Sequence, residues 1–538
     1  MKGLDLGHMG SLLQSCMRAK ALKPGKQIHA LLLSSGADTN VESLNSKLVG
    51  VYAGCGDVES ATVIFEQIHR PSVFAWNWMI SASAFQGNCE NAIRYFSRLL
   101  QAGIFPNRFT FSYSLKACVG MMDINKGKEF HCAIYRMGFE SDVSVTNALI
   151  DMYSKCGGMD FARRLFDGMS QRDVATWTSM ICGYSFGKNL EQSAILFEQI
   201  KLENLEPNHF TWNAMIAGYA QNGDCNRAFV LFSRMKETGL FPDLVTWNAM
   251  IAGFTQNHES TKAIELFREM LVSGLKPNPV TISGLLPAFG LMGSLHRGRQ
   301  IHGLIYRTGL DINVFTSTAL IDMYSKCGSV KDACNVFDRI AVKNVASWNA
   351  MIGCYGKHGM VDASIELFKI MQEESVKANQ VTFTCLLSAC GHGGLVEKGL
   401  EIFRSMKEKY STEFSNEHYA CIVDLLCRSG RLEEAYDLVK EIPMEINDSI
   451  AGAFLNGCRI HGRSDLAKQM AEMIVAMELK RPGGFVTLSN IYAADGEWEG
   501  VETVRRLMKE KSVVKKPGYS WLEKKDELVR FKVGKSVF

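Results

Sequence analysis

The feature that most constrains this chain is an internal repeat built around tryptophan. Five near-identical phrases, mostly of the form WNxMI, open at tryptophans that are 101, 35, 35 and 101 residues apart. The separation of 101 is the length of two 35-residue units and one 31-residue unit. Self-similarity at such a period is typical of a solenoid, in which each unit buries its apolar face only against its neighbours. The tryptophans are Trp76, Trp177, Trp212, Trp247 and Trp348.

A second phrase gives the same register. LIDMYSKCG occurs at residues 149–157 and again at 320–328, a shift of 171, which equals one interval of 101 and two of 35. Both phrases therefore belong to one set of units that tiles the chain without a linker.

Residues 244–278 show what one unit is. Apolar residues recur at helical spacing in both halves, and the polar Asn257 separates the halves. Gly274 ends the second half as a C-terminal cap, and Pro277 prevents its continuation. The sequence therefore predicts an all-α solenoid of helix-turn-helix repeats, each of 31–36 residues. The regular array covers residues 6–447, degenerate repeats follow over 448–513, and a tail covers 514–538.

Composition excludes several classes of protein. The 59 basic and 56 acidic residues nearly balance, so any affinity for nucleic acid must come from a local stripe. We expect no membrane span, since no apolar run approaches 18 residues. The 16 cysteines contain no CxxC pair, which favours reduced thiols, and we expect neither a metal site nor a cofactor.

These motifs resemble the pentatricopeptide repeat family, and specifically its plant PLS subfamily, in which standard, long and short repeats alternate. The resemblance rests on WNAMI openings closed by KPN or FPD, on GKQIH at 25–29 and GRQIH at 298–302 in long units, and on DMYSKCG in short units. It implies a right-handed superhelical solenoid that binds single-stranded RNA. One departure is that residues 174–278 hold three consecutive standard-like units.

The main rival is the tetratricopeptide family, whose helical hairpins bind peptides. Its repeat is 34 residues long. The spacings of 35 and 31, and the polar residue directly after each opening tryptophan, favour the RNA-binding family.

The resemblance points to the fifth and the last residue of each unit as the residues that read one base. All are short and polar, and an amide or hydroxyl can pair with the edge of an unstacked base. A capping role competes for each residue taken singly, but recurrence in register favours base contact. The pairs are Asn77 with Asn107, Asn147 with Asp173, Thr178 with Asn208, Asn213 with Asp243, Asn248 with Asn278, Thr318 with Asn344, and Asn349 with Asn379.

The pairing preferences of the family imply a target sequence. Asn with Asn implies a pyrimidine, Asn with Asp implies U, and Thr with Asn implies A. From residue 73 onward the implied target, 5′ to 3′, is Y-?-U-A-U-C-?-A-Y. Long units and the first short pair, Ser46 with Ser72, stay unassigned.

Basic residues at the thirteenth place of several units form a candidate phosphate stripe. Cationic donors along a groove supply the sequence-independent part of RNA binding, although a solvated surface is an equal alternative. The stripe is incomplete, because Phe85 and Phe186 occupy the place in two units. Its charged members are Lys155, Lys326, Lys357 and Arg428.

The C-terminal region resembles the E and E-plus motifs of this family, with PGYSWLE at 517–523. In the fullest members a cytidine deaminase domain follows, whose zinc site needs an HxE and a downstream CxxC. Neither motif occurs here, so we expect an RNA-binding protein that is not an enzyme.

The resemblance favours a site-recognition factor for C-to-U editing of an organellar transcript. Its partners would be single-stranded RNA, a deaminase-bearing pentatricopeptide protein acting in trans, and small organellar editing factors. Alternatives are an RNA stabilisation, processing or splicing factor, and a protein-binding scaffold. The resemblance implies the mitochondrion, with the chloroplast as alternative, although the first repeat starts near Leu6 and leaves no room for a transit peptide.

Overall fold

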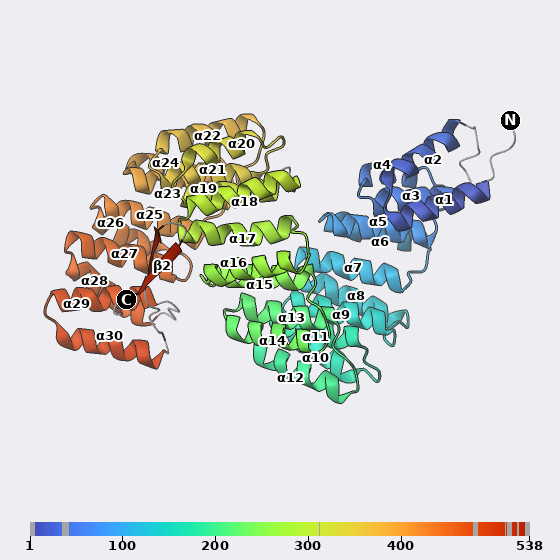
Figure 1. Ribbon diagram of the computed structural model, residues 1–538, viewed down its shortest axis with the longest axis horizontal. Coiled ribbons are helices and arrows are strands. Elements are labelled where there is room, and N and C mark those ends of the chain that lie inside the picture. The colour runs from blue at the N-terminus through green and yellow to red at the C-terminus, as the bar shows by residue number, and fades with distance from the viewer. Residues whose placement is uncertain are drawn as a thin grey trace. The chain divides into compact units, whose positions relative to one another are not determined.

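The computed structural model describes residues 6–34, 42–310, 313–410, 412–476, 482–511, 513, 519–524 and 527–532. The chain divides into two compact units, Met1–Gly253 and Phe254–Phe538, and the boundary falls inside helix α15 (Leu244–Gln256). Each unit is a stack of helical hairpins (Figure 1).

Every repeat contributes a first helix to this stack. Each of these helices begins at the residue where the sequence places the start of a unit, so the predicted helical hairpins are confirmed. Besides α15 they are α1 (Leu6–Ala19), α3 (Glu42–Gly54), α5 (Val73–Phe85), α7 (Arg108–Met121), α9 (Val143–Lys155), α11 (Val174–Phe186), α13 (His209–Gln221), α17 (Pro279–Met292), α19 (Val314–Lys326), α21 (Val345–Lys357), α23 (Gln380–Gly393), α25 (Asn416–Arg428), α27 (Asp448–His461) and α29 (Pro482–Ala494).

A second helix completes each hairpin. These helices are α2 (Leu22–Ser34), α4 (Val58–Glu66), α6 (Cys89–Gln101), α8 (Ile124–Arg136), α10 (Met159–Gly168), α12 (Leu190–Leu202), α14 (Cys225–Glu237), α16 (Ser260–Val272), α18 (Leu295–Thr308), α20 (Val330–Asp338), α22 (Val361–Glu373), α24 (Val396–Glu408), α26 (Leu432–Glu441), α28 (Ser464–Ala476) and α30 (Trp498–Glu510).

Within each of the two compact units, the first helices of successive repeats pack on one another. Thus α7 contacts α5 and α9, and α21 contacts α19 and α23, whereas a second helix contacts its own first helix and the first helix of the next repeat. Within each compact unit the first helices therefore form one layer, and the same place of successive repeats recurs along it.

The repeated tryptophan is the joint between hairpins. Its ring meets, edge to face, a phenylalanine of the preceding second helix, with ring centroids 4.7–5.1 Å apart. Trp212, for example, is 1% exposed and packs on Phe197 at 4.8 Å. Such aromatic pairs bury large apolar areas, which explains why tryptophan marks the period. The pairs are Phe65–Trp76, Phe166–Trp177, Phe197–Trp212, Phe232–Trp247 and Phe337–Trp348.

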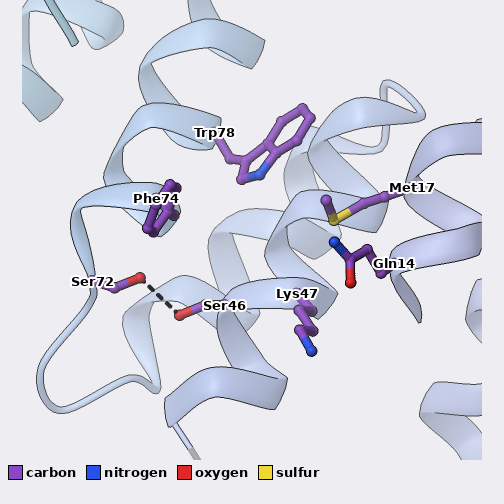
Figure 2. Close-up of a pocket in the computed structure, with 7 residues that line it drawn as sticks. All are labelled: Gln14, Met17, Ser46, Lys47, Ser72, Phe74 and Trp78. Atoms are coloured by element: carbon purple, nitrogen blue, oxygen red, sulfur yellow. Dashed lines mark hydrogen bonds between the residues drawn. The ribbon is translucent and has the colours of Figure 1, made fainter. Parts of the chain in front are cut away.

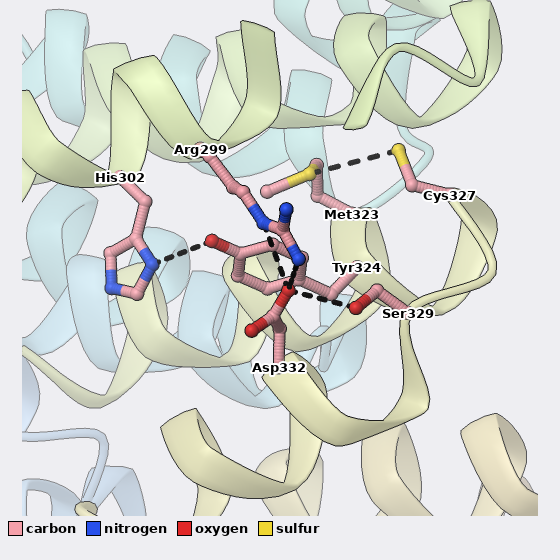
Figure 3. A network of polar contacts seen from close by, with 7 residues as sticks. All are labelled: Arg299, His302, Met323, Tyr324, Cys327, Ser329 and Asp332. Carbon is pink, nitrogen blue, oxygen red and sulfur yellow. Dashed lines mark hydrogen bonds and ion pairs between the residues drawn. The ribbon is translucent and has the colours of Figure 1, made fainter. Parts of the chain in front are cut away.

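The GRQIH phrase of a long unit holds it against the short unit that follows. His302 of α18 hydrogen-bonds the hydroxyl of Tyr324 in α19 at 2.8 Å, and Arg299 pairs with Asp332 of α20 at 2.8 Å (Figure 3). Gly298 lets the helices approach, since an added Cβ would lie 2.5 Å from the sulfur of Met323. Burial raises the pKa of Tyr324 to about 12, so its hydroxyl stays protonated at neutral pH.

The same junction recurs in the other long units. His29 hydrogen-bonds Tyr52 at 2.9 Å and His131 hydrogen-bonds Tyr153 at 2.9 Å. In the first of them, Lys26 and Asp57 repeat the ion pair at 2.9 Å. Packing between hairpins therefore accounts for these phrases.

The C-terminus departs from the all-α pattern of the array. Strands β1 (Tyr519–Lys524) and β2 (Glu527–Lys532) form an antiparallel pair in which Tyr519 lies opposite Lys532. In the sequence, Leu528, Arg530 and Lys532 alternate with Val529 and Phe531, which predicts a short strand after a charged turn. Strand β2 confirms it, but the sequence does not predict its pairing with β1. Pro517, at the start of the PGYSWLE phrase, lies outside the described residues.

No helix in the described ranges combines the length and the apolar character that crossing a bilayer requires.

Candidate nucleic-acid interface

The last residue of a repeat is the N-cap of the next first helix. Asn107 Oδ1 accepts hydrogen bonds from the backbone N–H groups of Phe109 and Thr110, at 3.0 and 3.1 Å. Asp243 Oδ1 accepts one from Thr246 N at 2.9 Å, and Asn379 Oδ1 accepts one from Thr382 N at 3.1 Å. Asn, Asp and Ser are the best capping residues, so capping explains why they recur at this place. Recurrence in register therefore does not distinguish capping from base contact, and base contact at these places stays a prediction.

The fifth residue reaches the same cap oxygen when it is asparagine. The donor is its side-chain amide in every case. The N–O distances are 3.0 Å for Asn77 to Asn107, 3.2 Å for Asn147 to Asp173, 3.2 Å for Asn213 to Asp243 and 3.0 Å for Asn349 to Asn379. The structure thus brings together four of the seven predicted pairs.

Two of the remaining three pairs have a threonine at the fifth place and behave differently. The hydroxyls of Thr178 and Thr318 bond the backbone oxygens of Val174 and Val314, both at 2.7 Å, and no bond to Asn208 or Asn344 is found among the described residues. Thr178 Oγ1 also lies 2.8 Å from Thr211 Oγ1, so this shorter side chain contacts the threonine at the third place of the next repeat and not the cap residue. The last pair, Asn248 with Asn278, lies on opposite sides of the boundary between the two compact units, so each is placed only within its own unit.

A threonine at the third place of the next repeat completes this arrangement. Thr110 Oγ1 donates to Asn77 Oδ1 at 2.7 Å, and Thr246 Oγ1 donates to Asn213 Oδ1 at 2.6 Å. Both threonines are fully buried. The sequence analysis missed these residues, although a Thr three places after each Asn or Asp is the pattern of a capping box.

The two predicted reading places differ in exposure. Asn77, Asn213 and Asn349 are only 6–8% exposed, whereas the last residues Asn107 and Asp243 are half-exposed and Asn379 is exposed. The side chain of the fifth residue therefore mainly holds the last residue in position, and the last residue is the one whose polar atoms are accessible to a ligand.

The cap leaves one polar atom of the last residue available. Asn107 Oδ1 is occupied by the helix N-terminus and by Asn77, while Asn107 Nδ2 makes no hydrogen bond to any residue that the structure describes. In Asp243 the corresponding atom is Oδ2, which likewise has no hydrogen-bond partner among the described residues. An asparagine thus presents a donor where an aspartate presents an acceptor.

A third set of residues, which the sequence analysis did not single out, lies at the second place of the repeats. Large apolar side chains stand there in solvent, 45–76% exposed, at the start of the first helix and two residues after the cap. A hydrophobic residue that recurs exposed in register indicates a binding surface. The signal in the sequence was a Phe or Val directly after the first residue of a unit. The residues are Phe74, Phe109, Phe210, Val245, Val280, Phe315 and Val381.

Each basic residue proposed to follow the phosphates is paired with an aspartate on the same face. Lys155 lies 2.7 Å from Asp151, and Lys326 lies 2.6 Å from Asp322, both four residues apart on one helix. Arg428 pairs in the same way with Asp424 at 2.7 Å, and Lys357 lies 3.9 Å from Asp322. The stripe is therefore close to neutral, and it supplies less attraction to phosphate than its basic residues alone suggest.

Among the described residues, no group of three or more His, Cys, Asp or Glu side chains has a geometry that could hold a metal ion.

The cap at Asp243 makes stability depend on pH. Burial raises the pKa of its carboxyl, but hydrogen bonds from Thr246 and Asn213 outweigh this effect and hold the pKa below its ordinary value. The carboxylate therefore stabilises the fold above the unfolded-state pKa of about 3.9, and this contribution is lost as the pH falls through the lower folded-state value. We expect the wild type to lose stability relative to Asp243→Asn as the pH falls from about 5 to about 2. Parallel unfolding free energies over that range would contradict this assignment.

The architecture, with helical hairpins of 31–36 residues capped in register by Asn and Asp, defines a helical-repeat solenoid protein. Models described as "PPR repeat family" match residues 207–246, 242–290 and 343–392, and "PPR repeat" matches 144–174, 315–345, 381–410 and 417–445. "Pentatricopeptide repeat domain" matches 65–121 and 170–222, and "E motif" matches 461–523.

Curated relatives agree along nearly the whole chain. Pentatricopeptide repeat-containing protein At5g59600 of Arabidopsis thaliana is 39% identical over 520 residues, which cover 97% of each protein. The chloroplastic protein At1g11290 from the same plant is 35% identical over 97% of this chain and 56% of its own length. The chain belongs to the pentatricopeptide repeat family. It spans about half the length of several curated relatives that it matches.

A solved structure of PPR10 in complex with an 18-nt psaJ RNA element aligns with 94% of this chain and 85% of that one, at 17% identity and a TM-score of 0.44.

Proposed function

We propose that this protein binds single-stranded RNA in a sequence-specific manner, one nucleotide per repeat, along the edge formed by the last and second places. The observation that carries the proposal is the cap residue with one atom fixed and one atom available. Such an atom is held in place before RNA arrives, so little conformational entropy is lost on binding.

The available atom distinguishes bases by hydrogen-bond polarity. Nδ2 of Asn107 is a donor, which complements N3 of cytosine, an acceptor. Oδ2 of Asp243 is an acceptor, which complements the N3–H of uracil. The exchange of Asn for Asp at the last place thus reverses the preference, in agreement with the pyrimidine and U assignments of those repeats.

The exposed apolar residues of the second place supply affinity that does not depend on sequence. An aromatic ring stacks on any base, because every base has a π-face. Successive repeats would then hold one base between two second-place side chains. The paired basic residues of the thirteenth place, Lys155, Lys326, Lys357 and Arg428, contribute a weaker attraction to phosphates.

A change of base preference at one repeat tests the reading residues. We expect Asn213→Thr with Asp243→Asn to move the preference at the fifth nucleotide of Y-?-U-A-U-C-?-A-Y from U to A. A mismatch at a protein–DNA site costs roughly 1–3 kcal/mol, and on that scale the shift is about tenfold. Gel shifts with four RNAs that differ at this nucleotide measure the preference, and a scrambled RNA is the control. An unchanged preference for U would refute the register.

We further propose that the protein is a site-recognition factor for C-to-U editing in an organelle, the mitochondrion or the chloroplast. Support comes from the match to the E motif at 461–523 and from relatives whose names carry the words chloroplastic and mitochondrial. The 538 residues contain no HxE and no CxxC, so on this proposal the deaminase activity comes from outside them, in trans. Small organellar editing factors are the other expected partners.

Sequencing of organellar transcripts from plants that lack the protein tests the editing role. We expect one or a few cytidines, each a few nucleotides downstream of the implied target, to remain unedited. Intact editing combined with altered transcript ends or unspliced introns would instead select the role in stabilisation, processing or splicing.

A further inference from the structure

An ion pair recurs at the same two places of three repeats. An aspartate stands at the ninth place and a lysine or arginine at the thirteenth, so each pair spans one turn of a first helix. Both places lie on the side of the helix that carries the second-place side chain, because seven residues make about two turns. In the part of the chain that the structure describes, every ion pair between residues of first helices joins these two places. The pairs are Asp151–Lys155 on α9, Asp322–Lys326 on α19 and Asp424–Arg428 on α25.

Two of these aspartates have one oxygen held by the cation and one oxygen available. Asp424 Oδ2 accepts from Arg428 Nε at 2.7 Å, and its Oδ1 has no hydrogen-bond partner among the described residues. Asp322 Oδ2 accepts from Lys326 Nζ at 2.6 Å, whereas its Oδ1 lies 3.9 Å from Lys357 Nζ, too far for a hydrogen bond. The two side chains are 30% and 35% exposed, and neither available oxygen is buried. Each repeat thus presents a fixed acceptor to solvent.

A carboxylate at the ninth place is unexpected on a surface that follows phosphates. It repels them, and an exposed ion pair adds little to the stability of the fold. A carboxylate only accepts hydrogen bonds, so a partner on the nucleic acid must be a donor. Within a strand, the ribose–phosphate backbone of RNA has one donor, the 2′-hydroxyl, which DNA lacks.

The ninth place also lies where a ribose is expected. On the proposed function the base contacts the last and second places, and the phosphate lies near the cation of the thirteenth place. The ninth place is about 10 Å along the helix from the second, between these two contacts. The sugar is the part of a nucleotide that joins base to phosphate, so it should pass this carboxylate.

We propose that Asp151, Asp322 and Asp424 accept a hydrogen bond from the 2′-hydroxyl of a ribose, while the paired cation contacts the neighbouring phosphate. These repeats then select RNA over single-stranded DNA. The inference rests on the proposed function, and it adds recognition of the sugar to recognition of the base.

The repeat that begins at Glu42 is an internal control. Gly50 and Gly54 stand at its ninth and thirteenth places, and the indole of Trp78 lies over both, since an added Cβ would approach that ring to 2.9 Å and 3.4 Å. Trp78 and Met17 line a cavity of about 550 Å³ there (Figure 2). With no carboxylate at the ninth place, this repeat should not contact a 2′-hydroxyl.

A scan of 2′-fluoro substitutions tests the proposal. The RNA carries the implied target with one added nucleotide at the 5′ end and two at the 3′ end, and one ribose at a time has fluorine in place of its hydroxyl donor. We expect binding to weaken about tenfold at three nucleotides, the scale of one hydrogen bond to a charged group, and by less than about threefold elsewhere. The three should be spaced by five and then by three nucleotides, as the repeats that carry the aspartates are.

This spacing does not depend on which ribose faces which repeat. The nucleotide three places 5′ of the first sensitive one corresponds to the repeat with Gly50 and should be insensitive. A flat profile, or sensitive nucleotides at other spacings, would overturn the proposal.

Asp322→Ala adds a result with opposite signs for RNA and DNA. We expect RNA to bind more weakly and the fluorine effect to vanish at one nucleotide, whereas single-stranded DNA of the same sequence binds more tightly because Lys326 is no longer neutralised. Glu366→Ala is the matched control, because it removes an exposed pair with Lys369 at 2.8 Å on the second helix α22 and should leave the scan unchanged. If Asp322→Ala strengthened RNA and DNA binding alike, the aspartate would only neutralise the lysine and the proposal would fail.

The wild-type titrations separate this inference from the proposed function. If the protein prefers the implied target to a scrambled RNA but the fluorine scan is flat, only the sugar assignment fails. If it shows no such preference, the proposed function fails as well.

Discussion

Removing three stacking side chains should weaken RNA binding by at least a hundredfold. Phe109, Phe210 and Phe315 are 45%, 76% and 66% exposed at the second place of three repeats. Alanine substitution of an aromatic residue that stacks on a base costs about 1–3 kcal/mol, and three such losses total at least about 3 kcal/mol. Because each of these side chains is at least 45% exposed, the fold should lose less stability than it does when a core aromatic residue is removed. Anisotropy titration at fixed salt measures the loss.

Exposed aromatics on second helices give a matched control. Tyr135, Phe229 and Tyr306 are 70%, 46% and 65% exposed on α8, α14 and α18. Their replacement by alanine removes a comparable aromatic area from the other layer of the hairpins. RNA binding should stay within about twofold of the wild type. An equal loss of RNA affinity in both triple variants would mean that the second-place side chains do not contact RNA preferentially, and it would contradict the stacking proposal.

Trp212→Ala should lower the free energy of unfolding by about 3–5 kcal/mol, the range for large aromatic residues removed from a core. Trp212 is 1% exposed and joins its hairpin to the preceding one through Phe197. In a solenoid, stability is approximately the sum of repeat terms and nearest-neighbour interfaces, so the loss acts on an interface. Urea denaturation followed by circular dichroism measures it.

Trp498→Ala is the control for this prediction. Trp498 opens α30 and is 69% exposed, so its removal should change stability by less than about 0.5 kcal/mol. If Trp212→Ala were as mild as Trp498→Ala, the tryptophan would not be the joint between hairpins.

The repeats and their register could be predicted from the sequence, for a physical reason. Each hairpin buries the same face against its neighbours, so Trp, Gly and Asn recur at fixed places, and the start of each first helix followed from that register. The strand β2 could be expected from alternation, but its partner β1 could not, since pairing depends on where the chain turns.

The hydrogen bonds and ion pairs at the candidate interface could be predicted only in part. The sequence put Asn77 and Asn107 in one pair, but it could not show that the oxygen of Asn107 is consumed by the helix N-terminus. Nor could it show that Lys155 is neutralised by Asp151, although the spacing of four residues on a helix allowed it. Both corrections concern which atoms already have a hydrogen-bond or ion-pair partner. That depends on interatomic distances, which the sequence does not give.

The shared cap oxygen has a consequence for how such a protein changes over time. The residue proposed to choose a letter of the RNA at one repeat also begins the next helix, so its alphabet is limited to side chains that start helices well. Asn and Asp cap helices about equally well, so an exchange between them should cost the fold little. On the proposed function, such an exchange would change the preferred base at one repeat while the protein stays folded.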